Sequence, residues 1–426
     1  MRLHFLAFLS LVLASACRDA GARTAFSDPE TVSAATTVGA APMFALSARG
    51  TRAVAWVSAP DAGTDGRLYV STGGAPSELR DSLGPIEPHG EAPPKLSYGP
   101  DGTLYALYAV GKVVPGRRFP MSSLRLAKSV DDGKTWSAPA TIASDSAFGT
   151  RNFHALHIGG DGALYVGWLE ANQGKSKTFL TRSTDQGATW TTPVAADANQ
   201  SCPCCRTSIA TASDGTLYLA WRTVLPGNVR DVVVARSTDH GATWAPPVRV
   251  HADNCVFDGC PHAGPSMQVD SAGTVHIAWW TGKQGAAGTF YARSTDKGAT
   301  FGSPIPLGVG EFSAPAHVQL ALGPNQTIVA VWDDGTVKTP KVVMRVSHDN
   351  GTSFGPAALV SSEGRAATFP VLALRDRDLT IAWSEQSVAE HDHEKDMAPN
   401  IKDPKAVKGL SRVGQSAVRV RNGRLQ

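Results

Sequence analysis

The chain has 426 residues, a length that suits either two domains or one large repeat fold. Its apolar fraction of 42% is sufficient for a core, while 42 glycines and 28 prolines indicate many turns. The formal charge of +3 comes without a long basic run, which argues against a nucleic-acid partner.

The N-terminus has the pattern of an export signal. The apolar run over residues 3–16 is shorter than the roughly 20 residues that cross a membrane, but it suits the core of a signal peptide. Its end, Ala14 to Cys17, resembles a bacterial lipobox, in which the cysteine is lipidated. We therefore expect a signal peptide over 1–16, a lipidated tether over 17–30 and one domain over 31–426. The expected location is periplasmic or on the outer membrane, as a lipoprotein held to the membrane through Cys17; the alternative is plain cleavage after Ala16.

One short motif recurs five times along the chain. The copies are SVDDGKTW from Ser129, STDQGATW from Ser183, STDHGATW from Ser237, STDKGATF from Ser294 and SHDNGTSF from Ser347. Their aspartates, which follow one another at steps of 54, 54, 57 and 53 residues, are Asp131, Asp185, Asp239, Asp296 and Asp349. A carboxylate can accept backbone N–H groups in a tight turn, the glycine allows a positive φ, and the last aromatic residue can pack between sheets.

A second repeat supports the same unit. Seven alternating strands end in an aromatic residue, at Trp56, Tyr108, Trp168, Trp221, Trp279, Trp332 and Trp383. Each unit has the order strand, turn, strand, longer loop, strand, motif turn, strand. Such units describe an all-β propeller of four-stranded antiparallel blades, with seven blades expected and six as the alternative.

The first and last units are incomplete. The motif of the first unit is degenerate near Ser71 (STGGAPSE), and the last unit ends in SAVRVRNG without a fourth strand. We expect residues 31–38 to supply that strand, so that the two termini close the ring and remove the exposed sheet edges.

The five motifs resemble the Asp boxes, or BNR repeats, of the sialidase superfamily. The resemblance covers most of the mature chain and implies the propeller fold. It does not imply an activity, because the same boxes occur in hydrolases, sorting receptors and assembly factors.

Two loops between blades carry an unusual set of cysteines. NQSCPCCR contains Cys202, Cys204, Cys205 and Arg206, and DNCVFDGCPH contains Cys255, Cys260 and His262. Cys202 and Cys260 each lie 19 residues before the aromatic residue of their blade, and Cys204 and His262 each lie 17 before it. Equal offsets on adjacent blades predict that the two groups meet near the central channel.

Two interpretations of this set remain open. In an exported protein, two disulfides could clamp the loops and leave one thiol over. Alternatively, thiolates and an imidazole suit a soft metal, so a copper or zinc ion is the candidate cofactor.

Other polar residues are expected on the same face and are candidates for ligand binding. They are Arg151, His154, Arg206, His317 and Arg365. The segment His391 to Met397 (HDHEKDM) also holds several metal-binding side chains.

A sialidase would use three arginines on the sugar carboxylate and a tyrosine nucleophile with a carboxylate partner. The early Arg-Ile-Pro motif of the family is absent, and its nearest match, Arg118-Phe119-Pro120, lies in a loop of the second unit. The last tyrosine, Tyr291, precedes the final two units, where the family places its nucleophile. The expected function is therefore an exported module that binds a metal or another ligand, such as a glycan or an envelope protein, through its Cys/His/Arg face. An exo-α-sialidase or another glycoside hydrolase is the alternative.

Overall fold

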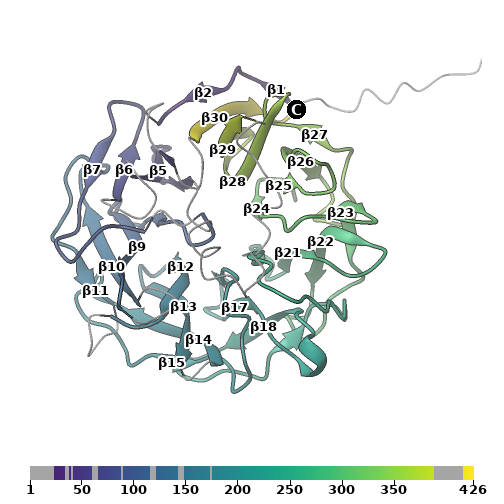
Figure 1. Ribbon diagram of the computed structural model, residues 1–426, viewed down its shortest axis with the longest axis horizontal. Coiled ribbons are helices and arrows are strands. Elements are labelled where there is room, and N and C mark those ends of the chain that lie inside the picture. Colours follow the sequence, from purple (N-terminus) through teal and green to yellow (C-terminus); the bar gives the residue numbers. More distant parts are fainter. Residues whose placement is uncertain are drawn as a thin grey trace, which may run out of the picture.

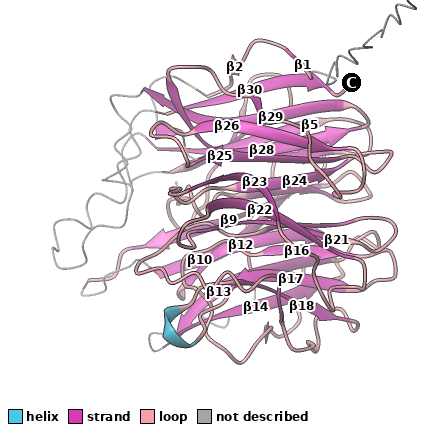
Figure 2. Cartoon of the chain, turned by 90° about the vertical axis from the view of Figure 1, so that its right-hand side faces the viewer, coloured by secondary structure: helices cyan, strands magenta, loops and turns pink. Residues whose placement is uncertain are grey.

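The computed structural model describes residues 24–33, 38–39, 42–59, 66–87, 90–115, 121–142, 148–172, 175–387 and 416–426. These residues form seven antiparallel sheets arranged as a ring around a central axis (Figure 1), and the side view shows the stacked strands of the blades (Figure 2). The seven-bladed all-β prediction is therefore confirmed. One turn of 3-10 helix, Pro226–Asn228, is the helical element of the described chain, and none of its helices is long and apolar enough to span a membrane.

The strands follow the chain blade by blade. The first three blades comprise β3 (Val38–Gly39) with β4 (Met43–Leu46), β5 (Arg52–Ala59), β6 (Arg67–Ser71) and β7 (Ser77–Leu79); β8 (Lys95–Tyr98), β9 (Leu104–Lys112), β10 (Met121–Ser129) and β11 (Ala140–Thr141); and β12 (Arg151–Ile158), β13 (Leu164–Asn172), β14 (Lys175–Ser183) and β15 (Val194–Ala195). The next three comprise β16 (Ser208–Thr211), β17 (Leu217–Arg222), β18 (Val232–Ser237) and β19 (Val248–Arg249); β20 (Ser266–Val269), β21 (Val275–Thr281), β22 (Ala287–Ser294) and β23 (Ile305–Gly310); and β24 (Val318–Leu322), β25 (Ile328–Asp334), β26 (Lys341–Ser347) and β27 (Ala358–Leu359).

The last blade joins the two ends of the chain. It contains β28 (Arg365–Arg375), β29 (Asp378–Ser387) and β30 (Ala417–Arg424), and its outer edge is paired by β1 (Ala25–Phe26) and β2 (Glu30–Thr31). Closure by the N-terminus is thus confirmed, but its expected position is wrong, because β3 pairs with β5 in the first blade. The sheet pairing also begins before residue 31, since β1 and the first residue of β2 lie in the segment expected to be a tether.

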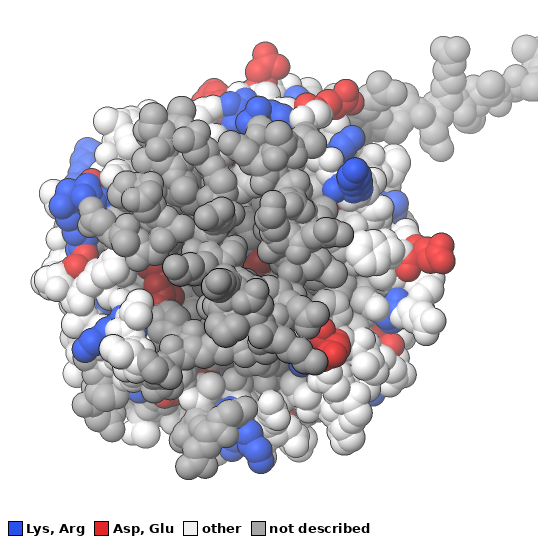
Figure 3. Space-filling view, viewed as in Figure 1, with Lys and Arg blue, Asp and Glu red and all other residues white. Residues whose placement is uncertain are grey.

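The core is divided among the interfaces between blades. Within the described chain, a hydrophobic cluster lies between each pair of neighbouring sheets, including the pair formed by the last and first blades. The aromatic residues of the second strands are at the centre of these clusters; Trp221 and Trp383, for example, are completely buried. On the face seen in Figure 3, charges of both signs are interspersed around the rim.

The motif turns have the geometry expected from their sequence. In the second Asp box, the Asp185 carboxylate accepts hydrogen bonds from the backbone N–H of Thr189 at 2.8 Å and from the Ser183 hydroxyl at 2.8 Å. Ser183 Oγ accepts the N–H of Gly187 at 2.9 Å, and Gly187 has a φ of 85°. Hydrogen bonds from Thr189 lower the pKa of Asp185 to about 2, which keeps the carboxylate ionised in the turn.

Candidate functional site

The two cysteine-rich loops lie on the face of the propeller opposite to the Asp boxes. Each Asp-box turn joins the third and fourth strands of a blade, whereas the cysteine loops join β15 to β16 and β19 to β20, from one blade to the next. Because neighbouring strands are antiparallel, these two kinds of connection leave opposite ends of the strands. The innermost strands start where the cysteine loops end.

The structure brings four of the five cysteines and the histidine into one group, which we call the thiol cluster: Cys202, Cys204, Cys205, Cys260 and His262. The Sγ atoms of Cys202 and Cys204 lie 3.7 Å apart, as do those of Cys202 and Cys205. The sulfurs of Cys204 and Cys260 and a ring nitrogen of His262 also lie within 4.8 Å of one another. Cys204 is therefore common to two sets of three donor atoms, and the predicted meeting of the two loops is observed.

Two arginines lie beside Cys202 of this cluster. Arg230 donates a hydrogen bond to Cys202 Sγ at 3.3 Å, and Arg222 is fully buried nearby. Hydrogen bonds from Cys204 and Cys205, with the charges of Arg230 and Arg222, hold the pKa of Cys202 well below its usual range. The contact with Cys202 raises the pKa of Cys204, and burial raises that of Cys205. The surroundings therefore favour the ionised form of Cys202 and the protonated forms of Cys204 and Cys205.

Arg222 also fixes the position of the second loop. Its guanidinium donates hydrogen bonds to the carbonyl oxygens of Ala263 at 3.0 Å, Arg230 at 2.7 Å and Trp280 at 2.6 Å. Ala263 directly follows His262, so this buried side chain connects the loop that carries His262 to the second strand of the fourth blade.

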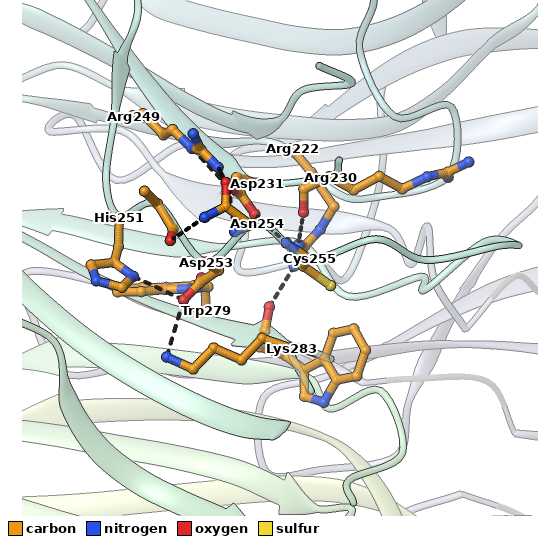
Figure 4. Close-up of polar contacts among 12 residues, drawn as sticks. Arg222, Arg230, Asp231, Arg249, His251, Asp253, Asn254, Cys255, Trp279 and Lys283 are labelled. Atoms are coloured by element: carbon orange, nitrogen blue, oxygen red, sulfur yellow. Dashed lines mark hydrogen bonds and ion pairs between the residues drawn. The ribbon is translucent and has the colours of Figure 1, made fainter. Parts of the chain in front are cut away.

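Cys255 lies outside both sets of donor atoms and is held by the buried carboxylate of Asp231 (Figure 4). Asp231 accepts the backbone N–H groups of Cys255 at 3.2 Å and Asn254 at 3.1 Å, and it pairs with Arg249. Asp253 of the same loop accepts the indole N–H of Trp279 at 2.7 Å. These contacts shape the loop, and the sulfur of Cys255 is not needed for them.

One member of the thiol cluster and one of its neighbours have strained backbone conformations. His262 and Phe153 both adopt left-handed conformations, with φ of 54° and 55°, and their rings lie 6.2 Å apart. Bulky residues rarely adopt such angles unless the surrounding structure imposes them, and such strained conformations are frequent at functional sites.

A second charged group lies at the start of the innermost strands, close to the channel. His317 Nε2 is 2.8 Å from Glu91 Oε2, and its Nδ1 is 2.7 Å from Asp333 Oδ2. Burial alone would lower the pKa of His317, but Asp333 and Glu91 outweigh this effect and raise it to about 9. His317 is therefore a buried cation held between two carboxylates. Sequence reasoning found His317 but missed both acids.

The other predicted ligand-binding residues do not form an arginine clamp. Arg151 pairs with Glu170 at 3.2 Å and Arg365 pairs with Glu385 at 3.0 Å. His154 is fully buried on β12, and Arg206 faces the channel. Cys17, Arg118 to Pro120 and His391 to Met397 lie outside the described residues.

The last tyrosine of the chain, Tyr291, lies away from the face that carries the cysteine loops. Tyr291 is fully buried on β22, and its hydroxyl lies 2.7 Å from His276 Nδ1. The same hydroxyl lies against Gly351 of the fifth Asp box, at the opposite end of the blade from the thiol cluster.

Residues 86–256 match the family model described as a BNR repeat-like domain. Among solved structures, the fold is similar to that of a protein of unknown function from Dyadobacter fermentans, with 15% identity, a TM-score of 0.53 and coverage of 95% of this chain and 99% of that chain. It is also similar to the polysaccharide lyase Uly1 (10% identity, TM-score 0.53, 94% and 99% covered) and to a PL25 ulvan lyase bound to -[GlcA(1-4)Rha3S]- (12% identity, TM-score 0.53, 78% and 87% covered). No curated protein matches the chain. At these identities, the structural likeness concerns the fold alone.

Proposed function

We propose that this chain, which is a sialidase-like β-propeller of the BNR-repeat kind, is a metal-binding module that holds a thiophilic ion in its thiol cluster. The fold supplies the scaffold and leaves the function to the loops. The observation that supports the proposal best is the pair of three-donor sets that share Cys204. Sulfur and imidazole donors favour Cu(I) or Zn(II) over hard cations.

The charges around the cluster support the same proposal. Arg222 and Arg230 place two positive charges beside Cys202, and such charges stabilise thiolates. Metal binding requires deprotonated sulfurs, so the ion would displace protons from Cys204 and Cys205. The apparent affinity is therefore expected to rise with pH.

The test is a metal titration of the reduced full-length protein under anaerobic conditions. Cu(I) and Zn(II) are titrated separately against chromogenic chelators, which tells the two ions apart. Replacing the shared ligand, in Cys204→Ser, is expected to weaken binding by about 100-fold or more, because both donor sets lose a member. Cys255→Ser is the matched control, since its sulfur belongs to neither set, and it should bind like the wild type. Equal affinities of Cys204→Ser and the wild type would contradict the proposal.

The disulfide clamp makes a different prediction for the same cysteines. Thiols counted under denaturing conditions would then increase by four on reduction. The metal proposal instead expects the same count with and without reductant once the ion has been chelated. A gain of four thiols would favour the clamp.

We also propose that the protein is exported and anchored through lipidated Cys17, as the lipobox-like ending suggests. A location in the cell envelope would give the metal site access to envelope proteins or glycans as partners. Tyr291 is not proposed as a sialidase-type nucleophile, because its hydroxyl lies 2.7 Å from His276 Nδ1 and against Gly351, at the end of the blade opposite to this face.

A further inference from the structure

A cavity of about 190 Å³ lies among the innermost strands, separate from the thiol cluster. Lys95, Arg206 and His317 contribute to its lining, and each stands at or just before the start of an innermost strand. The three side chains therefore approach the cavity from the same end of the channel, from the second, fourth and sixth blades.

The acids near this cavity are already engaged. Glu91 and Asp333 both bond to His317, and Asp333 also accepts the backbone N–H of Phe369 at 3.0 Å. The Phe369 ring packs on His317, with the ring centroids 4.4 Å apart. The two carboxylates thus balance the charge of His317 and hold it in place.

Two further basic residues line the cavity: the charges of Glu91 and Asp333 act on Arg206, whereas Lys95 has no carboxylate partner among the described residues. Lys95 and Arg206 are 8% and 9% exposed, and Arg206 Nη2 is buried without a hydrogen bond to any described residue. Burial and the positive charge of Arg206 hold the pKa of Lys95 well below its usual range. Because two adjacent buried cations would repel each other, this environment favours the neutral form of Lys95 unless an anion compensates its charge.

We propose that this cavity binds a small oxyanion, a carboxylate or a sulfate-type group, between Lys95 and Arg206. Its volume equals the space of about six water molecules at ~30 Å³ each, so it accommodates a small acid or one acidic group of a larger molecule. Arg206 offers a planar fork that matches two oxygens, and Lys95 adds a point charge. This site neighbours the proposed metal centre, since Arg206 directly follows Cys205, but none of the thiol-cluster residues lines the cavity.

Anion binding is coupled to a proton. The ionisable groups that line the cavity with Lys95 are Arg206, His317 and His157, and Glu91 lies on the segment that leads into β8. Burial keeps His157 neutral by lowering its pKa to about 4, and His317 is already charged. Lys95 is therefore the group that gains a proton when an anion enters, and binding should weaken as the pH rises.

The experiment is calorimetric titration of the full-length protein with sodium acetate and sodium sulfate, with glycerol as a neutral probe. Acetate and sulfate separate the two kinds of oxyanion. We expect saturable binding of at least one of them, with proton uptake seen as a dependence of the heat on the ionisation enthalpy of the buffer. Lys95→Met and Arg206→Gln should each weaken this binding by about tenfold or more.

Two controls keep the result interpretable. Lys297→Gln removes an exposed lysine in an Asp-box turn and should bind like the wild type. Cys204→Ser removes the proposed metal ligand and should also retain anion binding, so failure of one proposal can be told from failure of the other. Lys95→Met replaces a buried amine by an apolar side chain and should be at least as stable as the wild type without anion. Absence of binding for both anions, or unchanged binding in Lys95→Met, would overturn the proposal.

Discussion

The buried cation His317 makes the stability of the propeller dependent on pH in the alkaline range. Its pKa is about 9 in the folded state, against 6.5 for an unperturbed histidine. The folded state therefore keeps a proton that the unfolded chain releases. The contribution of His317 to the free energy of unfolding is complete below pH 6.5 and is lost as the pH rises through 9. The pKa difference corresponds to about 3 kcal/mol.

Urea unfolding of the wild type and of His317→Gln, measured at several pH values from 6.5 to 9.5, tests this expectation. The stability difference between the two proteins should shrink by about 3 kcal/mol across the range. His157→Gln is the matched control, because burial lowers the pKa of His157 to about 4 and this histidine is neutral throughout most of the range. Its difference from the wild type should stay nearly constant. Parallel curves for the wild type and His317→Gln would refute the assignment of a charged His317.

Three other predictions concern the fold and the anchor. Gly241→Ala should lower the free energy of unfolding by about 2 to 4 kcal/mol, since the new Cβ at φ 91° would lie 2.6 Å from a Leu180 methyl carbon. Gly273→Ala, at φ 84° with nothing within 4 Å, should lower it by about 1 kcal/mol. Equal urea midpoints for the two variants would contradict the packing argument. Trp221→Ala should cost about 3 to 5 kcal/mol by denaturant unfolding, because its side chain is completely buried between two blades; a loss below about 1 kcal/mol would contradict this. Cys17→Ser should release the protein from membranes into the soluble periplasmic fraction, and unchanged fractionation would count against lipidation.

The propeller could be predicted because its signals are local and repeated. Each Asp box satisfies its own turn with residues within four positions, as Ser183, Asp185 and Thr189 show, so the sequence pattern contains the whole interaction. The closing strands were placed wrongly for the opposite reason. β1 and β2 have two residues each, which is too short for a periodic pattern, and their pairing depends on β30 at the other end of the chain.

The candidate site likewise has a part that the repeated sequence pattern predicts and a part that it does not. The thiol cluster could be predicted because the cysteines and His262 occupy equal offsets in adjacent blades, and a ring brings equal offsets together. Glu91 and Asp333 do not share a repeated offset with His317. Glu91 comes from another blade, 226 positions away in sequence, whereas Asp333 lies 16 positions away on β25 of the same blade. The burial of Lys95 could not be predicted, because it results from the position of the residue at the channel and not from its neighbours in sequence.

X-ray absorption at the K edge of the ion, measured on the metal-loaded full-length protein, tests the metal-binding proposal most directly. We expect a first shell dominated by sulfur, at about 2.3 Å if the ion is Zn(II). In Cys204→Ser this sulfur shell should be lost or reduced, while Cys255→Ser should leave it unchanged. A shell of nitrogen and oxygen alone, or the same sulfur shell in Cys204→Ser, would contradict a metal centre in the thiol cluster.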